Sequence, residues 1–232
     1  MPQAATMRDL FDRVARRYDL TNRVLSAGSD VRWRRAVVQE VLRDNPQRVL
    51  DACSGTADQA MAVAEEKNFH GTVICTDISL EMLLRGAEKI RQNHQDPLAV
   101  LSDVHRLALQ ANVFDCVTVC FGVRNFDSIV EGLKELRRIL RPQGKVVILE
   151  FTRPAHPWVR RLYHEYLTKA LPCIGGILTG QFGAYRYLAT SIEGFISPQE
   201  LTERLESAGF VDVRHRFLTL GIVSITTARK EV

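Results

Sequence analysis

Residues 48–58 read RVLDACSGTAD, a short apolar run that ends in an aspartate and a turn of small residues. The run has the length of a β-strand, and the helical pattern QAMAVAEEK at 59–67 follows the turn directly. Further apolar runs rich in Val and Ile, most of them followed by a helical pattern, recur downstream. This alternation is typical of βαβ units and predicts an α/β fold with a mainly parallel sheet.

The alternation assigns an element to most of the chain beyond residue 48. Strands are predicted at 48–53, 72–78, 98–104, 116–122 and 145–151, with two further β-rich runs at 212–218 and 222–228. Helices are predicted at 59–67, 79–92, 127–140 and 197–209. Ser79 and Asp127 are the expected N-caps of the second and third helices. Arg141-Pro142 and Gly209 mark where the third and fourth helices should end.

Two stretches fall outside this alternation and are predicted to act as lids. Residues 1–45 are helical and precede the first strand, and residues 153–196 interrupt the sheet after its fifth strand. Open α/β sheets bind ligands beyond the carboxyl ends of their strands, where such segments could cover a site. We therefore expect a single domain over 1–232, which comprises an N-terminal helical cap (1–45), a cofactor-binding core (46–152), a lid insertion (153–196) and a C-terminal helix with strands (197–232).

Composition narrows the class of protein. Of the 232 residues, 46% are hydrophobic and 25% are charged, which is ordinary for a globular protein, and the net charge of +4 is too small to indicate nucleic acid. The five cysteines include no CxxC pair, so we predict reduced thiols and no metal site, with Cys116 and Cys120 packed as small apolar residues. The N-terminal segment lacks the pattern of a leader, and no apolar stretch approaches about 20 residues. These features predict a cytoplasmic protein that at most binds the inner face of a membrane.

Three predicted strands end in an aspartate, at Asp51, Asp77 and Asp103. Each could simply cap the helix that follows, but three carboxylates at one edge of a sheet favour a ligand site. Asp77 holds the position from which an acidic side chain reaches ribose hydroxyls, and Asp103 is expected at the edge of an adenine. The small residues of the turn at 54–57 would let a ligand approach the backbone closely.

The turn after the first strand lacks a dinucleotide fingerprint. The first and last glycines of G-x-G-x-x-G correspond to Cys53 and Asp58. A nicotinamide-dependent oxidoreductase, the alternative for such a sheet, is therefore disfavoured. Acids at the strand ends and a small-residue turn, without a phosphate-binding feature, suit S-adenosylmethionine, which carries a ribose, an adenine, an amino acid and a sulfonium but no phosphate.

Longer motifs carry a resemblance to a known family. They are Tyr18-Asp19-x-x-Asn22-x-x-Leu25-Ser26 with Trp33, DACSGTAD (51–58), FGVRNF (121–126), RILRPQGKVVILEFTRP (138–154) and AYRYLATSIEGF (184–195). Over nearly the whole chain the sequence resembles the ubiquinone/menaquinone biosynthesis C-methyltransferases of the UbiE/MenG type. The resemblance implies a Rossmann-like class I methyltransferase fold, with a mainly parallel seven-stranded sheet, flanking helices and helical lids. It also implies methyl transfer from S-adenosylmethionine to a ring carbon of a polyprenyl quinol.

The resemblance further implies a set of site residues and partners. The expected contacts of S-adenosylmethionine are Thr56, Asp77, Asp103, Val104 and Cys120, together with Asp51, Ser54 and Gly55 of the first turn. The acceptor is expected to contact Tyr18, Tyr185 and Arg186. Demethylmenaquinol is the predicted acceptor, and a ubiquinol precursor is the alternative. A non-catalytic subunit of a quinone-synthesis assembly is a third interpretation, and a homodimer is left open.

Five positions depart from the family pattern. Ser54 and Ala57 replace two glycines of the first turn, and Gln143 replaces a glycine before the fifth strand. Thr21 and Asp30 stand where the pattern has a methionine and a histidine. Loss of the two glycines in the first turn is expected to narrow the amino-acid end of the cofactor pocket.

Arg124 and Asn125 follow a run fit for a buried strand and should point beyond the sheet. Methylation of a quinol carbon is favoured when a neighbouring ring oxygen is ionised. Arginine is a poor proton acceptor because its pKa exceeds about 12, but it stabilises an oxyanion, while Asn125 can bond the second ring oxygen. We therefore predict that both are catalytic; the structural alternative is an Arg124 that pairs with a carboxylate such as Asp127. The general base is left open among His105, Tyr185 and a bound water.

The segment WVRRLYHEYLTKALPCIGGIL at 158–178 predicts an amphipathic helix. Its apolar face is expected to contain Trp158, Leu162, Tyr166, Leu167, Ala170 and Leu171, with Arg160, Arg161 and Lys169 mostly on another face. One interpretation is a lid packed on the core. The other is a surface that receives a polyprenyl tail and touches the membrane that holds it.

Overall fold

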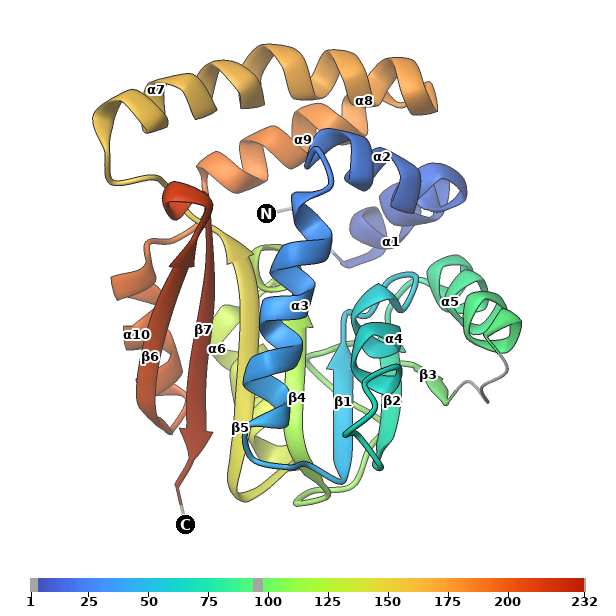
Figure 1. Cartoon of the computed structure of the whole chain (residues 1–232), viewed down its shortest axis with the longest axis vertical. Coiled ribbons are helices and arrows are strands. Elements are labelled where there is room, and N and C mark those ends of the chain that lie inside the picture. The colour runs from blue at the N-terminus through green and yellow to red at the C-terminus, as the bar shows by residue number, and fades with distance from the viewer. Residues whose placement is uncertain (1–3, 94–97, 232) are drawn as a thin grey trace.

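The computed structural model describes residues 4–93 and 98–231 and has a seven-stranded sheet at its centre (Figure 1). The strands are β1 (Arg48–Ala52), β2 (Thr72–Asp77), β3 (Ala99–Leu101), β4 (Phe114–Cys120), β5 (Leu140–Phe151), β6 (Phe210–Leu218) and β7 (Val223–Lys230). Their order across the sheet is β3-β2-β1-β4-β5-β7-β6, and β7 runs antiparallel to both of its neighbours. The other pairings are parallel, which confirms the predicted α/β fold.

Helices cover both faces of the sheet and its carboxyl edge. They are α1 (Ala4–Val14), α2 (Tyr18–Leu25), α3 (Ser29–Leu42), α4 (Asp58–Ala64), α5 (Leu80–Gln92), α6 (Ile129–Ile139), α7 (Pro157–Glu165), α8 (Leu171–Thr179), α9 (Phe182–Glu193) and α10 (Pro198–Ser207). In Figure 1, α3 and α4 lie in front of the sheet, and α6 and α10 lie behind it.

The central strands are apolar on both faces because helices cover both faces. Along β5, Val146 and Ile148 belong to the core on the side of α6 and α10, while Val147 and Leu149 belong to the core on the side of α3. Alternate side chains of a strand point to opposite faces, so a strand buried on both sides becomes a continuous apolar run. The same packing accounts for Cys116, which lies buried in the α3-side core, as predicted.

Helix ends follow local capping chemistry, with one prediction corrected. The Ser79 side chain accepts a hydrogen bond from the backbone N–H of Met82, which confirms it as the N-cap of α5. The N-cap of α6 is Ser128 rather than Asp127, since the Ser128 hydroxyl accepts the bond from the N–H of Glu131. The helix also ends earlier than expected, because β5 already begins at residue 140.

Of the two stretches outside the βα alternation, the helices α1, α2 and α7 to α9 lie above the carboxyl ends of the parallel strands, whereas α3 packs on a face of the sheet and is not part of the lid expected over 1–45. Figure 1 shows α7 and α8 crossing the top of the molecule, with α9 and α2 beneath them. The two stretches contact each other directly, and the Tyr166 hydroxyl donates a hydrogen bond to the carbonyl of Leu25 over 2.6 Å. In the described part of the chain, no helix combines the length and apolar character needed to cross a membrane.

Gln143 carries a backbone conformation that favours glycine, with φ of +65°. The left-handed conformation destabilises the folded state by about 1–2 kcal/mol when the residue has a Cβ atom. Glycine avoids this strain, but it gives the unfolded chain more conformational entropy, which offsets a smaller part of the gain. We expect Gln143→Gly to raise the free energy of unfolding by about 0.5–1 kcal/mol in urea titrations. The matched control is Gln39→Gly, at an exposed position within α3. Glycine in a helix should lower the free energy of unfolding by about 1 kcal/mol. Equal losses in both variants would contradict the argument.

Candidate functional site

Two adjoining cavities lie above the carboxyl ends of the strands. The strand-end cavity, about 90 Å³ in volume, is lined by Gly55, Asp77 and Asp103 among others. The lid cavity is larger, about 530 Å³, and lies between helices α1 to α3 on one side and α7 to α9 on the other. Four residues line both cavities: Phe11, Tyr18, Phe121 and Asn125. A ligand in one cavity can therefore meet a ligand in the other at these four side chains.

Asp77 braces the turn after β1 and faces the strand-end cavity. Its Oδ2 accepts the N–H of Gly55 over 2.8 Å, and its Oδ1 accepts the N–H of Ser79 over 2.9 Å. Burial raises the pKa of this carboxyl, and the backbone N–H groups oppose that shift. Because each carboxylate oxygen has a second lone pair, both can still accept bonds from ligand hydroxyls.

Asp103 lies two residues beyond β3 and also lines the strand-end cavity, with Val104 and Cys120. Its Oδ1 accepts the N–H of His105 over 2.9 Å and lies 2.7 Å from His105 Nδ1. His105 Nε2 accepts the N–H of Ser128 over 3.3 Å. Both ring nitrogens of this predicted base candidate are thus occupied, and the ring lines the strand-end cavity but not the lid cavity.

Three predicted cofactor residues lie beneath the strand-end cavity rather than in its lining. Asp51 is buried, and it accepts hydrogen bonds from Thr118 Oγ1 over 2.7 Å and from the N–H of Ala60 over 3.1 Å. Burial raises the pKa of Asp51 to about 6. The Thr56 hydroxyl donates to Asp19, and Ser54 Oγ is buried. These side chains hold the turn in place, whereas Gly55 exposes its backbone to the cavity.

Arg124 lies in a short 3₁₀ turn after β4 and lines the lid cavity. Its side chain is only 5% exposed, and its Nη1 donates to Glu150 Oε1 over 2.8 Å. The backbone N–H of Arg124 donates to Glu150 Oε2 over 3.3 Å, and Nη1 also donates to the carbonyl of Phe121. The carboxylate that pairs with Arg124 is therefore Glu150. The structural alternative had named Asp127 for this role. Nε of Arg124 is buried with no hydrogen-bond partner among the described residues.

Asn125 lies at the boundary of the two cavities, held by a tyrosine from the lid. The Tyr187 hydroxyl donates to Asn125 Oδ1 over 3.1 Å, and no described residue accepts a hydrogen bond from the side-chain amide N–H groups of Asn125, which can therefore donate to a ligand. Tyr185 lines the lid cavity, and burial raises the pKa of its phenol. Arg186 is exposed and lines neither cavity, so its contact with the acceptor stays a prediction that the cavity linings do not support. Helix α9 turns it away, and Tyr187 lines the lid cavity instead.

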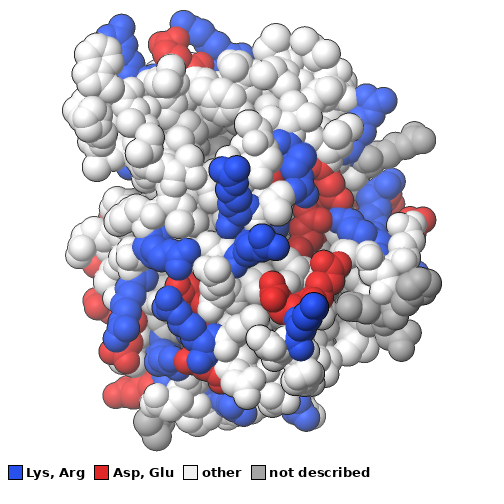
Figure 2. Space-filling model, viewed as in Figure 1, with Lys and Arg blue, Asp and Glu red and all other residues white. Residues whose placement is uncertain are grey.

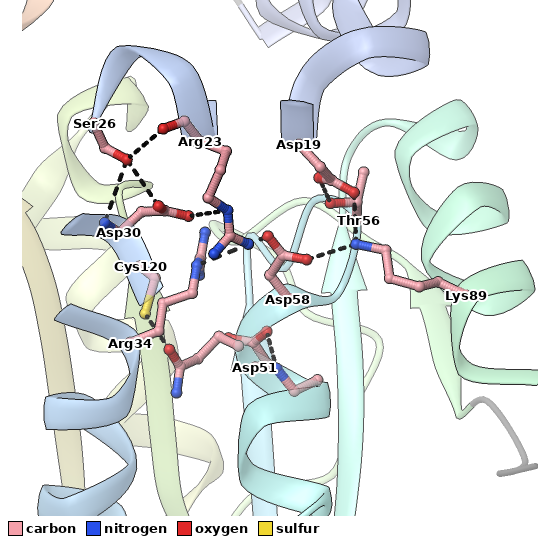
Figure 3. A network of polar contacts seen from close by, with 12 residues as sticks. Asp19, Arg23, Ser26, Asp30, Arg34, Asp51, Thr56, Asp58, Lys89 and Cys120 are labelled. Atoms are coloured by element: carbon pink, nitrogen blue, oxygen red, sulfur yellow. Dashed lines mark hydrogen bonds and ion pairs between the residues drawn. The ribbon is translucent and has the colours of Figure 1, made fainter. Parts of the chain in front are cut away.

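An ionic network ties the N-terminal cap to the turn after β1 (Figure 3). Lys89 of α5 contacts Asp19 of α2 over 2.6 Å and Asp58 of α4 over 2.5 Å. Arg34 of α3 points toward the same Asp58. Sequence reasoning missed Lys89 and Arg34 because each lies in a helix with no motif that marks it; the only signal was the basic residue directly after Trp33.

The predicted apolar face of the 158–178 segment is interrupted. Trp158 and Leu162 are each 74% exposed, whereas Leu167 and Leu171 are buried. A π-helical turn at Tyr166–Ala170 separates α7 from α8 and shifts the phase of the side chains between them. The single continuous face expected from a 3.6-residue period is therefore wrong. Figure 2 shows that the upper layer of the molecule, where α7 and α8 lie, carries fewer charged side chains than the lower part.

Comparison with known sequences gives a consistent result. A model of the ubiE/COQ5 methyltransferase family matches residues 2–230. A demethylmenaquinone methyltransferase of Thermus thermophilus is 38% identical over 216 residues, which cover 93% of this chain and 97% of the relative. A ubiquinone/menaquinone biosynthesis C-methyltransferase UbiE of Geobacter sulfurreducens is 38% identical over 229 residues, 97% of this chain and 88% of the relative. A demethylmenaquinone methyltransferase of Mycolicibacterium vanbaalenii is 40% identical over 221 residues, 95% and 93% of the two chains.

Solved structures share the fold at low sequence identity. The [4+2]-cyclase SpnF matches with a TM-score of 0.72 and 14% identity, over 100% of this chain and 97% of its own. A S-adenosylmethionine-dependent methyltransferase from Thermotoga maritima matches with a TM-score of 0.68 and 16% identity, over 97% and 100% of the two chains. These matches confirm the predicted Rossmann-like class I methyltransferase fold. Since a cyclase shares that fold, the reaction must be argued from the site.

Proposed function

The chain belongs to the ubiE/COQ5 methyltransferase family, and from this premise we propose that it methylates a ring carbon of a polyprenyl quinol with S-adenosylmethionine as methyl donor. Demethylmenaquinol is the acceptor we favour, because the relatives from Thermus and Mycolicibacterium carry the name demethylmenaquinone methyltransferase. A ubiquinol precursor is the second candidate, since the Geobacter relative is named for both quinones.

The charge of the strand-end cavity supports S-adenosylmethionine as the donor. Its described lining includes the carboxylates Asp77, Asp103 and Asp127 but no lysine or arginine. Such a lining repels a pyrophosphate and favours a cationic ligand. When bound, S-adenosylmethionine supplies an electrophilic methyl group on a sulfonium. Asp77 would hold the ribose hydroxyls, and Asp103 with Val104 would lie along the adenine.

The shared boundary of the two cavities is the observation that carries the proposal. A methyl group can pass only between molecules in direct contact, and Tyr18, Phe121 and Asn125 line both cavities. The lid cavity is largely apolar, as a polyprenyl quinol requires, and it is several times larger than the strand-end cavity. The donor and acceptor sites thus adjoin at Asn125.

Arg124 and Asn125 would bind the two quinol oxygens in the lid cavity. Glu150 fixes the Arg124 guanidinium through Nη1, which leaves the rest of the planar group to face the acceptor. A fixed positive charge lowers the pKa of a nearby phenol and stabilises its anion, so the ring carbon becomes more nucleophilic. Asn125, oriented by Tyr187, would donate to the second oxygen.

The test of this function is mass spectrometry of quinones in a bacterial host that lacks its own enzyme and expresses this one. Conversion of the accumulated demethylmenaquinone to menaquinone would support the favoured acceptor. Conversion of the ubiquinone precursor alone would select the second candidate. Calorimetric titration with S-adenosylmethionine and with NADH adds a direct readout. Tight binding of NADH without binding of S-adenosylmethionine would favour the alternative function as an oxidoreductase. Binding of neither ligand would favour a non-catalytic subunit.

The exposed rim of the lid cavity supports contact with an anionic membrane. Leu162 of α7 and Leu220 of the turn before β7 both line the cavity and are 74% and 77% exposed. Trp158 lies exposed one turn from Leu162, and Arg160 and Arg161 are exposed beside it. An apolar rim flanked by cations suits a lipid surface, from which a tailed quinol could enter the cavity.

We expect the protein to sediment with anionic vesicles at low salt and to be partly released as salt screens the arginines. Arg160→Gln/Arg161→Gln should weaken binding by about 1 kcal/mol per residue. The control is Arg32→Gln/Arg35→Gln, which removes two exposed arginines of α3 and should leave vesicle binding unchanged. No sedimentation at low salt, or equal loss in both double variants, would leave α7 as an ordinary lid helix.

A further inference from the structure

Arg34 lies in the lid cavity, next to one of the residues that line both cavities. It comes from α3, its side chain is only 15% exposed, and it lines the lid cavity. The centre of its guanidinium lies 5.9 Å from the centroid of the Phe121 ring, and Phe121 lines both cavities. Figure 3 shows the guanidinium close to the end of β4, where Cys120 lies. The positive charge of Arg34 is therefore held beside the point where donor and acceptor would meet.

The Arg34 guanidinium lacks a hydrogen-bonded carboxylate partner among the described residues. The carboxylate next to it is Asp58, whose Oδ2 lies 4.0 Å from Arg34 Nε, too far for a hydrogen bond. The other oxygen of Asp58 is held by Lys89 over 2.5 Å. Nε of Arg34 is buried without a hydrogen-bond partner in the described part of the chain. A buried charged donor of this kind binds an anion strongly when one reaches it.

The two arginines that line the cavities differ in their carboxylate partners, although Nε of each is buried without a hydrogen-bond partner among the described residues. Arg124 and Arg34 are the lysine or arginine residues in the described lining of either cavity. Arg124 has Glu150 at 2.8 Å, and the position of its guanidinium suits the quinol oxygen. Within the described part of the chain, Arg34 has no carboxylate at hydrogen-bond distance, and so it can form a full ion pair with a ligand. The site thus has two cationic groups for two ligands that each carry negative charge.

The donor carries one negative group, the α-carboxylate of its amino-acid arm. The carboxylates of the strand-end cavity, Asp77, Asp103 and Asp127, repel that group and suit the adenosine and the sulfonium. The sulfonium must reach the cavity boundary to deliver its methyl group, and the amino-acid arm begins at the same sulfur atom. The arm is a few bonds long, so its carboxylate falls near the boundary, where Arg34 is the cation that no carboxylate of the described residues holds by a hydrogen bond.

We infer that Arg34 binds the α-carboxylate of S-adenosylmethionine as a charge-assisted hydrogen-bond donor. The inference rests on the proposed function and assigns a cofactor contact outside the βα core, on the helix that precedes β1. It also gives the N-terminal cap a role in donor affinity, because α3 holds the arginine and the Lys89 network holds the cap to the turn after β1.

The test is calorimetric titration of S-adenosylhomocysteine, which keeps the carboxylate and needs no turnover. Arg34→Met should weaken its binding roughly 10- to 100-fold, the scale of a lost hydrogen bond to a charged group, and Arg34→Lys should restore part of it. Asp58 retains Lys89 in these variants, so the fold should persist, and thermal melting checks this. The control Arg35→Met, at the adjacent exposed position of α3, should leave affinity unchanged.

A second ligand separates pairing with the carboxylate from a change in cavity shape. Decarboxylated S-adenosylmethionine, whose arm ends in an ammonium group alone, should bind Arg34→Met at least as tightly as the wild type, because the two cations repel each other. Equal losses for both ligands, or no loss for either, would overturn the inference. A rise in the quinol KM with unchanged S-adenosylhomocysteine affinity would also overturn it, because Arg34 would then serve the acceptor. A wild type that binds neither ligand would instead reject the proposed function itself.

Discussion

Replacing Arg124 with alanine is expected to lower turnover by roughly 10²–10³-fold, the scale for removal of one oxyanion-stabilising donor. The guanidinium is proposed to stabilise charge that is larger in the quinolate than in the neutral quinol, so its loss affects turnover rather than donor affinity. Part of the loss should return at higher pH, because more of the quinol then ionises unaided. Steady-state rates across pH, with calorimetry of the cofactor, measure both effects.

The buried partner of Arg124 has to be included in the experiment. Arg124→Ala leaves the carboxylate of Glu150 buried without its cation, and removal of one member of a buried pair can cost about 3–5 kcal/mol of stability. The double variant Arg124→Ala/Glu150→Gln removes that charge and should recover most of the stability while the rate stays low. Arg124→Lys keeps a cation beside Glu150 but loses the planar fork, so its rate should be intermediate.

One pattern of results would show that Arg124 is only a structural brace. If Arg124→Ala/Glu150→Gln regains both stability and turnover, the single variant was slow only because its fold was disturbed. Turnover that stays low without any recovery at high pH would contradict the ionisation of the quinol as the step that the guanidinium assists.

The second large effect is expected for Asp77. Asp77→Ala should weaken S-adenosylmethionine binding by about 1.5–3 kcal/mol, the range for hydrogen bonds to a charged group. The substitution also frees the N–H groups of Gly55 and Ser79, so stability should fall, by about 1–3 kcal/mol for each of these groups that finds no other partner. Affinity therefore has to be measured by calorimetry well below the melting temperature of the variant.

Asp115 offers a matched control for Asp77. It is a buried aspartate near the opposite end of the sheet, where its Oδ2 accepts the N–H groups of Gln47 and Arg48 over 2.7 and 2.8 Å. Asp115→Ala should lower stability in the same way but leave cofactor affinity unchanged. If both variants lose affinity to the same degree, the carboxylate of Asp77 acts on the fold and does not contact the cofactor.

Several features of the fold were predictable because they depend on neighbouring residues. The strands were found from apolar runs, and the cap at Ser79 from a serine at the start of a helical pattern. Asp77 and Asp103 were expected to lie together because the carboxyl ends of parallel strands meet at one edge of a sheet, and both line the strand-end cavity. Asp51 follows the same pattern, yet its side chain points beneath the turn.

Other features depend on the register between neighbouring strands and on the rotation of one helix relative to the next. A pattern of consecutive residues does not predict either of these. Glu150 reaches Arg124 because the register of β4 against β5 pairs Cys120 with Leu149 and so brings the ends of both strands together. A π-helical turn between α7 and α8 displaces the apolar face that a 3.6-residue period predicts.

The sequence by itself determined the α/β fold, the strand-end acids and the family, because these rest on periodicity and on motifs of consecutive residues. Only the tertiary structure decided which residues face the two cavities. Arg186 is exposed, and Arg34, from a helix that precedes the first strand, lines the lid cavity. The physical reason is that a side chain acts through what surrounds it in space, and packing of the N-terminal cap onto the sheet brings Arg34 beside Phe121 and Asp58.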